Sequence, residues 1–304
     1  EGHRFTDIAE AAAFLKAPEG MNLLEKTSEG LAGDTVKVEV GGEAWYVKRV
    51  TKKLGDSIDD GLRSLTPRER AGNELAMREI VRRWFPETYR VAPEAIVVEH
   101  GGEIFVMTKG ADAAPAPERL QRMTAAEHAD YALLRLVFRA EDLNRGNVLF
   151  GKDGKPTLID FEKVIAEPLD PVKVARGADN EIFVKGFPVA SLRGSDMAVY
   201  RAHADKLRAR FDDPNFTARL NQVLERSGWT PERRAAYLKA IEINLRNFET
   251  NVQPYVDAAN KVAAKRLQGV GAADNFFDGP PDAVRARQNA DKASPLRQIQ
   301  ISLE

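Results

Sequence analysis

The sequence predicts an α+β protein of two lobes, with a strand-rich N-terminal lobe over residues 1–110 and a mainly helical C-terminal lobe over residues 111–268. Three observations lead to this expectation. Two pairs of strand-like segments, each joined by a Gly-Gly dipeptide, lie before residue 110. A long helix with a clear start signal separates the two pairs. Beyond residue 196, apolar residues recur at spacings of three and four, which is typical of helices.

The two strand pairs cover residues 35–40 with 43–50 and residues 95–100 with 103–108. Their β-branched and aromatic side chains favour extended structure, and the Gly-Gly dipeptide within each pair favours a tight turn. We therefore expect two antiparallel hairpins. Ahead of them, residues 1–25 are expected to be helical, with one apolar face made by Ile8, Ala11, Ala12 and Leu15.

A capping box marks the start of the long helix between the hairpins. Thr66 is a good N-cap residue, Pro67 suits the first helical position, and Glu69 can return a hydrogen bond to the cap. The helix is expected to run to about Trp84.

The C-terminal lobe follows a linker rich in Gly, Ala and Pro at residues 109–117. A second capping box, at residues 124–127, predicts a helix that ends near Phe138. Two short strands are expected after it, at residues 148–150 and 157–159.

The C-terminal part is expected to be dominated by a long helix that starts at Thr230. Pro254 is expected to kink or end this helix. Residues 269–304 are rich in Gly, Asp, Pro and Ala, and we expect them to form a loosely ordered tail. One face of the helix is predicted to be buried through Tyr237, Ile241, Leu245, Phe248, Val252 and Tyr255.

Composition and charge exclude several classes of function. The net charge is -1, and Lys and Arg are mixed with acidic residues, so no basic stripe indicates nucleic-acid binding. No apolar run approaches the roughly 20 residues of a membrane span, so membrane insertion is not expected. Cysteine is absent and the four histidines are scattered, which excludes the usual zinc spacings. A cytoplasmic location and export into a host or target cell both fit, and the oligomeric state stays open.

The chemistry is concentrated in three oxygen-bearing side chains. Asp142 is followed five residues later by Asn147 and thirteen residues after that by Asp160. Strand-like segments lie between and beside them. Amide and carboxylate oxygens are suitable ligands for Mg²⁺, and a further carboxylate can orient or deprotonate a hydroxyl. This set predicts the binding of a metal-bound nucleotide triphosphate next to a hydroxyl acceptor.

The motif resembles the protein-kinase-like superfamily over roughly residues 28–165. Asp142-Leu-Asn-Arg-Gly-Asn147 with Asp160-Phe-Glu is similar to the aminoglycoside and choline phosphotransferase branch. The preceding segment, Tyr131-Ala-Leu-Leu-Arg-Leu-Val-Phe138, is similar to the phosphatidylinositol-kinase and bacterial toxin kinase branch. The resemblance implies a bilobal kinase-like fold that uses ATP and Mg²⁺. It also implies that Asp142 is the catalytic base and that Asn147 and Asp160 are the metal ligands.

Further site residues follow from the same resemblance. Lys48, on the second strand of the first hairpin, would bind the nucleotide phosphates, although strand alternation alone does not decide which way it points. Glu74, preferred over Glu79, would be its ion-pair partner on the long helix. Gly30 and Gly33 would offer backbone amides to phosphate. The adenine would meet the backbone of residues 108–110, with its pocket lined by Met107 or a neighbouring residue.

The motif also departs from that of ordinary protein kinases. The full glycine-rich loop is absent, and Ala140-Glu141 stands before Asp142 in place of His-Arg. Glu162 occupies the position of a glycine, and a salt bridge is expected for it in preference to a metal contact. These differences leave the phosphate acceptor open.

The expected function is a phosphotransferase acting on a hydroxyl. A protein Ser or Thr is preferred as acceptor, because the helical region after Glu162 is large and shows no obvious acid cluster for a small substrate. The alternatives are a small-molecule phosphotransferase, an adenylyltransferase that binds the nucleotide in reverse, and a pseudokinase scaffold. An exported bacterial effector or toxin is one setting that fits these properties.

Overall fold

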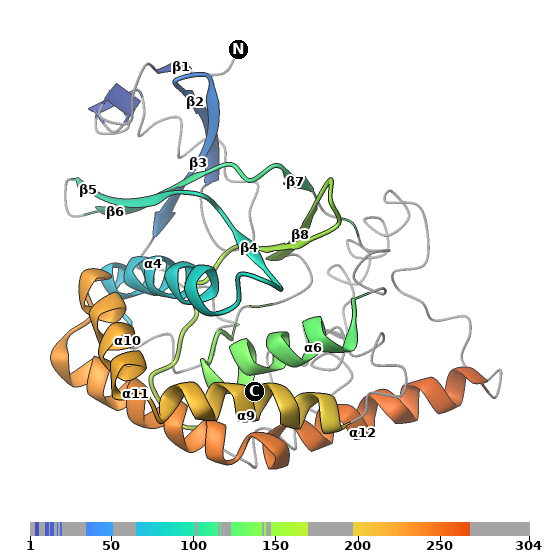
Figure 1. The fold of residues 1–304 in the computed structure, drawn as a ribbon. Coiled ribbons are helices and arrows are strands. Elements are labelled where there is room, and N and C mark those ends of the chain that lie inside the picture. The colour runs from blue at the N-terminus through green and yellow to red at the C-terminus, as the bar shows by residue number, and fades with distance from the viewer. Residues whose placement is uncertain are drawn as a thin grey trace, which may run out of the picture. The chain divides into compact units, whose positions relative to one another are not determined.

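Two β-sheets and a set of helices make up the part of the chain that can be described (Figure 1). The computed structural model describes residues 4–5, 10–11, 13–14, 17, 19, 35–50, 65–100, 103–114, 116, 123–141, 143, 147–169 and 197–267. By backbone proximity the chain divides into one unit, Glu1–Ala259, and a second, Asn260–Glu304. All described strands lie in the first unit. The predicted tail, residues 269–304, lies outside the described residues.

The larger sheet has five strands in the order β1-β2-β3-β6-β5. β1 runs parallel to β2, and the other neighbours are antiparallel. Gly41 and Gly42 have φ values of 57° and 81° between β2 and β3, as the predicted hairpin turn requires. The strands are β1 (Arg4–Phe5), β2 (Thr35–Val40), β3 (Glu43–Val50), β5 (Ala95–His100) and β6 (Glu103–Lys109). Both predicted strand pairs are therefore present.

The two faces of this sheet bury different side chains. Trp45, Val47 and Met107 are buried on one face, in a cluster that includes Ala11 from the N-terminal segment. The opposite face packs on the long helix in a cluster that includes Val50, Ile104 and Val106 with Ala71 of the helix. In residues 1–25, where a helix was predicted, residues 10–11 and 13–14 are helical, and residues 4–5 form β1.

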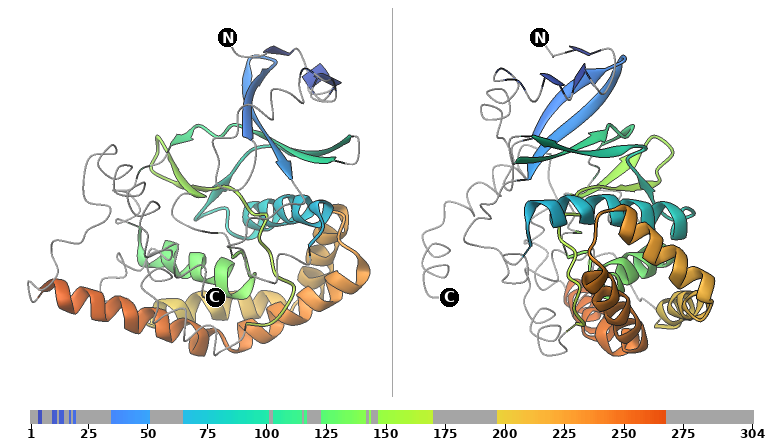
Figure 2. Two further views of the ribbon diagram at one scale, coloured as in Figure 1. Left: turned by 180° about the vertical axis from the view of Figure 1, so that it is seen from behind. Right: turned by 90° about the vertical axis from the view of Figure 1, so that its left-hand side faces the viewer.

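The long helix, α4 (Pro67–Trp84), has the predicted boundaries. The amide of Glu69 donates to the Thr66 hydroxyl at 3.2 Å, and the amide of Thr66 donates to the Glu69 carboxylate at 2.7 Å. This capping box satisfies two of the unpaired amides at the helix start. In both views of Figure 2, α4 lies between the five-stranded sheet and the C-terminal helices.

A second sheet of four short strands has the order β4-β9-β8-β7. The predicted hairpin is present as β8 (Val148–Gly151) and β9 (Pro156–Leu158). β4 (Arg90–Val91) and β7 (Ala113–Ala114) were not predicted. Because β4 precedes the linker and β9 follows it, this sheet contains strands from both sides of the predicted lobe boundary at residue 110. The boundary itself stays a prediction.

The helices differ from the prediction at two places. The helix that starts after Thr124 is α6 (Ala125–Ala132), and it continues as a π-helical segment, Leu133–Val137. The long helix expected from Thr230 is two helices, α11 (Pro231–Arg246) and α12 (Phe248–Leu267), separated at Asn247. Pro254 therefore lies inside α12 and does not end the helix.

The predicted apolar row is buried in spite of that break, because α11 and α12 contribute to the same core. All six residues from Tyr237 to Tyr255 belong to the largest buried cluster. α9 (Met197–Phe211) and α10 (Pro214–Arg226) complete this helical region. None of the described helices has the length and apolar character needed to span a bilayer.

Candidate functional site

Lys48 is at the centre of the candidate site. Its Nζ lies 2.9 Å from Oδ1 of Asp160 and 2.5 Å from Oε1 of Glu162. The three side chains are mostly buried, with 20%, 29% and 12% of their surface exposed. Burial alone would lower the pKa of Lys48, but the two carboxylates outweigh it and raise the pKa above its ordinary value. Lys48 therefore stays charged.

The sheet determines which way Lys48 points. Side chains alternate along β3, so Lys48 shares a face with Val50, which packs with Ala71 of α4. Trp45 and Val47 point to the opposite face. Lys48 is therefore directed toward α4 and the Asp160 segment, which settles the orientation that the alternation left open.

Asp160 and Asn147 lie at neighbouring positions where the β8–β9 hairpin opens. The amide of Ile159 donates to the carbonyl of Asn147 at 3.0 Å. Asp160 has a φ of 62°, a left-handed conformation that is uncommon for a residue other than glycine. Such conformations persist where the surroundings enforce them, and they concentrate at functional sites. The structure thus places the backbones of the two predicted metal ligands close together, and their roles stay predictions.

Glu74 is buried beside this segment, but its partner is not the one predicted. Its carboxylate accepts a hydrogen bond from the amide of Phe161. Among the described residues, Lys48 pairs with Asp160 and Glu162 instead. Burial, followed by the negative charge of Asp160, raises the pKa of Glu74 to about 7. Glu74 therefore fixes the backbone next to Asp160.

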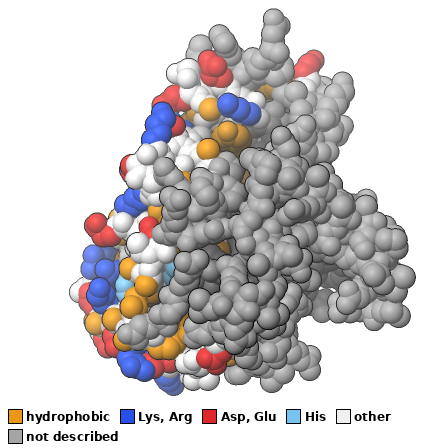
Figure 3. Space-filling view, turned by 90° about the vertical axis from the view of Figure 1, so that its right-hand side faces the viewer, with side chains coloured by type: hydrophobic (Ala, Val, Ile, Leu, Met, Phe, Trp, Pro, Cys, Tyr) orange, Lys and Arg blue, Asp and Glu red, His pale blue; other side chains and the backbone are white. Residues whose placement is uncertain are grey.

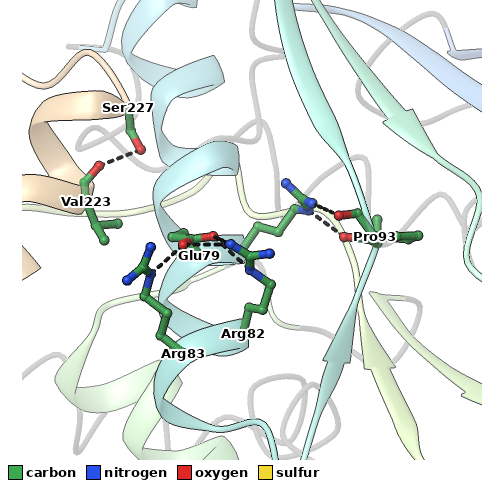
Figure 4. Close-up of polar contacts among 8 residues, drawn as sticks. Glu79, Arg82, Arg83, Pro93, Val223 and Ser227 are labelled. Carbon is green, nitrogen blue, oxygen red and sulfur yellow. Dashed lines mark hydrogen bonds and ion pairs between the residues drawn. The ribbon is translucent and has the colours of Figure 1, made fainter.

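Glu79, the alternative partner weighed for Lys48, points elsewhere. Figure 4 shows it between Arg82 and Arg83 on α4. Its carboxylate accepts hydrogen bonds from Nε and Nη2 of Arg82 at 2.9 Å and pairs with Nε of Arg83. On the same helix, Arg78 donates to the carbonyls of Ala92 and Pro93, which anchors α4 to the segment before β5.

Glu162 has the salt bridge expected for it. Besides Lys48, its carboxylate lies 3.4 Å from Nη1 of Arg70, which is 2% exposed. Its backbone carbonyl accepts a hydrogen bond from Nδ2 of Asn73 at 2.5 Å. Arg70 and Asn73 were missed in the sequence analysis. The available signal was their position on α4, one turn or less before Glu74, which places them near the same segment.

The backbone just before Asp142 is held next to residues 163–165, which follow Asp160. The amide of Glu141 donates to the carbonyl of Lys163 at 2.8 Å, and Ala140 pairs with Val164 in an isolated bridge. Leu143 is buried, and its carbonyl accepts a hydrogen bond from Tyr131. Asp142 itself, like Gly30 and Gly33, lies outside the described residues.

Met107 is not placed where the resemblance put it. It is fully buried on the sheet face opposite to Lys48, because it pairs with Val47 across β3 and β6. A contact with adenine from that position is not compatible with phosphates at Lys48. The amides of Lys109 and Gly110 donate to the carbonyls of Glu94 and Ala44 at 3.0 and 2.7 Å, so these two amides are already used within the chain.

Charged side chains of both signs lie on the described part of the face shown in Figure 3. On the face shown in Figure 3, the described basic and acidic side chains are interspersed and do not separate into patches of one sign. This agrees with the net charge of -1.

No protein-family model matches the sequence, and no curated protein matches it. Among solved structures, the chain is similar to the MAP kinase LmaMPK10 from Leishmania major, at 14% identity over 88% of this chain and 91% of that chain, with a TM-score of 0.31. It is also similar to the PknI kinase domain from Mycobacterium tuberculosis, at 16% identity over 69% and 91%, with a TM-score of 0.32.

A third similar structure is the complex of Rv3197 with erythromycin from Mycobacterium tuberculosis, at 15% identity over 83% of this chain and 85% of that chain, with a TM-score of 0.31. The first two of these structures are named as kinases. These identities and TM-scores are too low to support an argument about activity. The function proposed below depends on the geometry of the chain's own residues.

Proposed function

We propose that this protein is a phosphotransferase that uses Mg²⁺ and ATP. The observation that carries the proposal is the ion pair between Lys48 and Asp160, because it joins a strand lysine to a carboxylate on the residue after Ile159, whose amide bonds to the backbone of Asn147. A lysine suits phosphate as a point charge. An adjoining carboxylate and amide suit a hard divalent cation.

The donor set fits Mg²⁺ bound together with a nucleotide. Within the described ranges, no cluster of three or more His, Cys, Asp or Glu side chains could hold a metal ion. A dedicated all-protein cage is not needed here, since Mg²⁺ commonly takes one or two protein ligands and completes its shell with phosphate oxygens and water. Asn147 and Asp160 would supply those protein ligands, and the bound ion would neutralise charge on the phosphates.

The remaining roles follow from the same arrangement. Lys48 would bind phosphate oxygens, and Glu74 would hold the Asp160 segment through the Phe161 amide. Asp142 would orient or deprotonate the acceptor hydroxyl, a role supported by the motif and by the placement of its described neighbours. We propose a protein Ser or Thr as acceptor in preference to a small alcohol.

One observation favours a second candidate, a scaffold that transfers no phosphate. The amides of Lys109 and Gly110 donate to carbonyls of this chain, so they are not available to a nucleotide base. Lys48 is likewise paired with both Asp160 and Glu162. A pseudokinase role would follow if these contacts persist and nucleotide fails to bind.

Labelled ATP separates the candidate activities. The protein is incubated with Mg²⁺ and ATP carrying label at either the γ- or the α-phosphate, and label transfer to itself and to a cell lysate is measured. Transfer from the γ position alone supports the phosphotransferase, and transfer from the α position indicates adenylylation. No transfer and no nucleotide binding would indicate a scaffold.

Matched variants test the assigned residues. Asp160→Ala and Asp142→Ala are expected to lower γ transfer by at least about a hundredfold, because electrostatic and proton-transfer groups contribute on the order of 10²–10⁴ in rate. Asp153→Ala is the control, since Asp153 lies in the β8–β9 turn and pairs with the exposed Arg90. Full activity of Asp160→Ala would show that the metal assignment is wrong.

A further inference from the structure

Arg233 on α11 reaches the candidate site through a single buried side chain. Its Nη2 donates to Oδ1 of Asn73 on α4 at 2.7 Å and lies 3.4 Å from the carbonyl of Val164. Its guanidinium lies over the Trp229 ring, 3.8 Å from the ring centroid. Stacking and hydrogen bonding together fix the position of this guanidinium.

Asn73 uses its two ends for two different segments. Its Oδ1 accepts from Arg233, and its Nδ2 donates to the backbone carbonyl of Glu162 at 2.5 Å. Arginine only donates and a carbonyl only accepts, so the orientation of this amide is determined by its partners. Asn73 is fully buried, and each unmade bond would leave a polar group without water. Neither an aspartate nor a leucine can make both bonds.

The backbone of α4 at Gly72 packs closely against the segment that connects two of the C-terminal helices. A Cβ at Gly72 would lie 2.6 Å from the carbonyl oxygen of Ser227 and 3.4 Å from the Trp229 ring. α4 therefore touches the connection between α10 and α11 at the residue next to Asn73.

Both side-chain bonds that we find on the backbone of residues 161–162 come from α4. Glu74 accepts from the amide of Phe161, and Asn73 donates to the carbonyl of Glu162. Asp160, immediately before them, has a left-handed φ of 62°, which its surroundings must enforce. The position of α4 thus bears directly on the conformation of Asp160.

We propose that Asn73 and Arg233 are positioning residues, which hold the Asp160–Glu162 segment in its binding conformation by tying it to α11. This inference deepens the proposed function and rests on it. Neither residue contacts the phosphates or the metal in this scheme. They act through the Glu162 backbone and so set the geometry of Asp160.

The decisive variants act on the two ends of the Asn73 amide. Asn73→Asp keeps the size of the side chain and its acceptor for Arg233, but it loses the donor to Glu162. Arg233→Ala removes the other bond of Asn73, together with the contact to the Val164 carbonyl, the stacking on Trp229 and the ion pair with Glu69, and it leaves Lys48, Asp160 and Glu162 in place. Arg233→Lys keeps a donor for Asn73, so its exchange and binding should lie between those of Arg233→Ala and wild type. Arg234→Ala is the control, because its bonds stay within α10, α11 and their connection, at Asn221, Glu225 and Trp229.

Two readouts besides activity are measured on the full chain. Hydrogen exchange of the amides of residues 160–164, without nucleotide, reports the conformation of the segment directly. Binding of Mn²⁺ with a non-hydrolysable ATP analogue reports the competence of the metal site. We expect faster exchange at 160–164 and about tenfold weaker binding in Asn73→Asp and Arg233→Ala, since one lost buried hydrogen bond has that effect. Exchange in α9 and α12 should stay unchanged.

The inference would be overturned if Asn73→Asp and Arg233→Ala both exchanged at residues 160–164 as slowly as wild type and the Arg234→Ala control. If Asn73→Asp unfolds, Arg233→Ala and Arg233→Lys decide in its place. If wild type fails to bind the Mn²⁺–nucleotide probe, the proposed function falls. The exchange measurement then still decides whether Asn73 and Arg233 hold the segment.

Discussion

Lys48 and Asp160 are 112 residues apart in the sequence and are joined by a 2.9 Å ion pair. The pair links the centre of the five-stranded sheet to the end of the β8–β9 hairpin. Glu162 extends it to a second carboxylate, and the buried Glu74 adds a third nearby. Glu162 also pairs with Arg70, so these cations and carboxylates form one largely buried network around Asp160.

We expect strong coupling between Lys48 and Glu162. Lys48→Met leaves the carboxylates of Asp160 and Glu162 without their shared cation, and Glu162→Gln removes one of these charges. The double variant should therefore lose less stability than the sum of the losses in the two single variants. The coupling energy in a double-mutant cycle, measured by urea unfolding, should be about 1–3 kcal/mol.

The exposed pair of Arg90 and Asp153, at 2.6 Å, serves as the control cycle. Solvent screens it, so its coupling should stay below about 1 kcal/mol. Equal coupling in the two cycles would contradict the buried network.

Glu74 should make stability fall as the pH rises. Its pKa is about 7 in the folded protein and near 4.5 when unfolded. Between these values the folded protein keeps a proton that the unfolded chain has lost, so stability decreases across this window. Relative to wild type, Glu74→Gln should gain about 3 kcal/mol between pH 4.5 and pH 7, measured by urea unfolding at each pH.

Glu79→Gln on the same helix is the matched control, with the opposite sign. Although partial burial opposes it, the hydrogen bonds from Arg82 and Arg83 lower the pKa of Glu79. Relative to wild type, this variant should therefore lose stability as the pH rises toward the ordinary carboxyl value of 4.5, and the difference should stay constant above that value. A flat difference between Glu74→Gln and wild type would show that Glu74 is not buried as described.

His128, in contrast to Glu74, should make stability fall as the pH drops. Burial in α6 lowers its pKa from 6.5 to about 4. The unfolded chain takes up a proton below pH 6.5 and the folded protein does not, so stability falls as the pH drops toward 4. Between pH 6.5 and pH 4, the free energy of unfolding should therefore fall by about 3 kcal/mol less in His128→Leu than in wild type.

The contributions of Glu74 and His128 oppose each other between pH 4.5 and pH 6.5. Wild type should therefore show a weak net dependence there, and each single variant should reveal the contribution of the other residue. Unchanged slopes in His128→Leu would mean that this histidine titrates in the folded state as it does in water.

Gly72→Ala should destabilise the protein although it improves helix propensity. Propensity alone favours Ala over Gly by about 1 kcal/mol. The added methyl would lie 2.6 Å from the backbone oxygen of Ser227, which cannot rotate away. Overpacking of this kind costs about 1–3 kcal/mol, so the net change in the free energy of unfolding should be a loss. A gain in stability would show that α4 and the α10–α11 connection are not in close contact.

Much of the secondary structure could be predicted because its signals are local. The Gly-Gly turn of the first hairpin and the two capping boxes each lie within a few residues, and they define β2, β3 and the starts of α4 and α6. The two-residue strands β1, β4 and β7 could not be predicted, because they exist only through pairing with strands far along the chain.

The break at Asn247 was missed for a different reason. The apolar spacing continues across it, since α11 and α12 bury their residues in one core. Pattern alone therefore predicts a single helix. A helix end that keeps the same buried row leaves no mark in the hydrophobic periodicity.

The sequence alone determined which chemical groups are available: a lysine on a strand, and an Asn and an Asp at kinase-like spacing around a hairpin. Local interactions are enough to place these groups on their elements. Only the tertiary structure decided which groups meet. Asn73 reaches Glu162 across 89 residues and Arg233 across 160, through buried bonds that depend on how α4 packs between the sheet and the helices. Such contacts depend on packing, which no short-range pattern encodes.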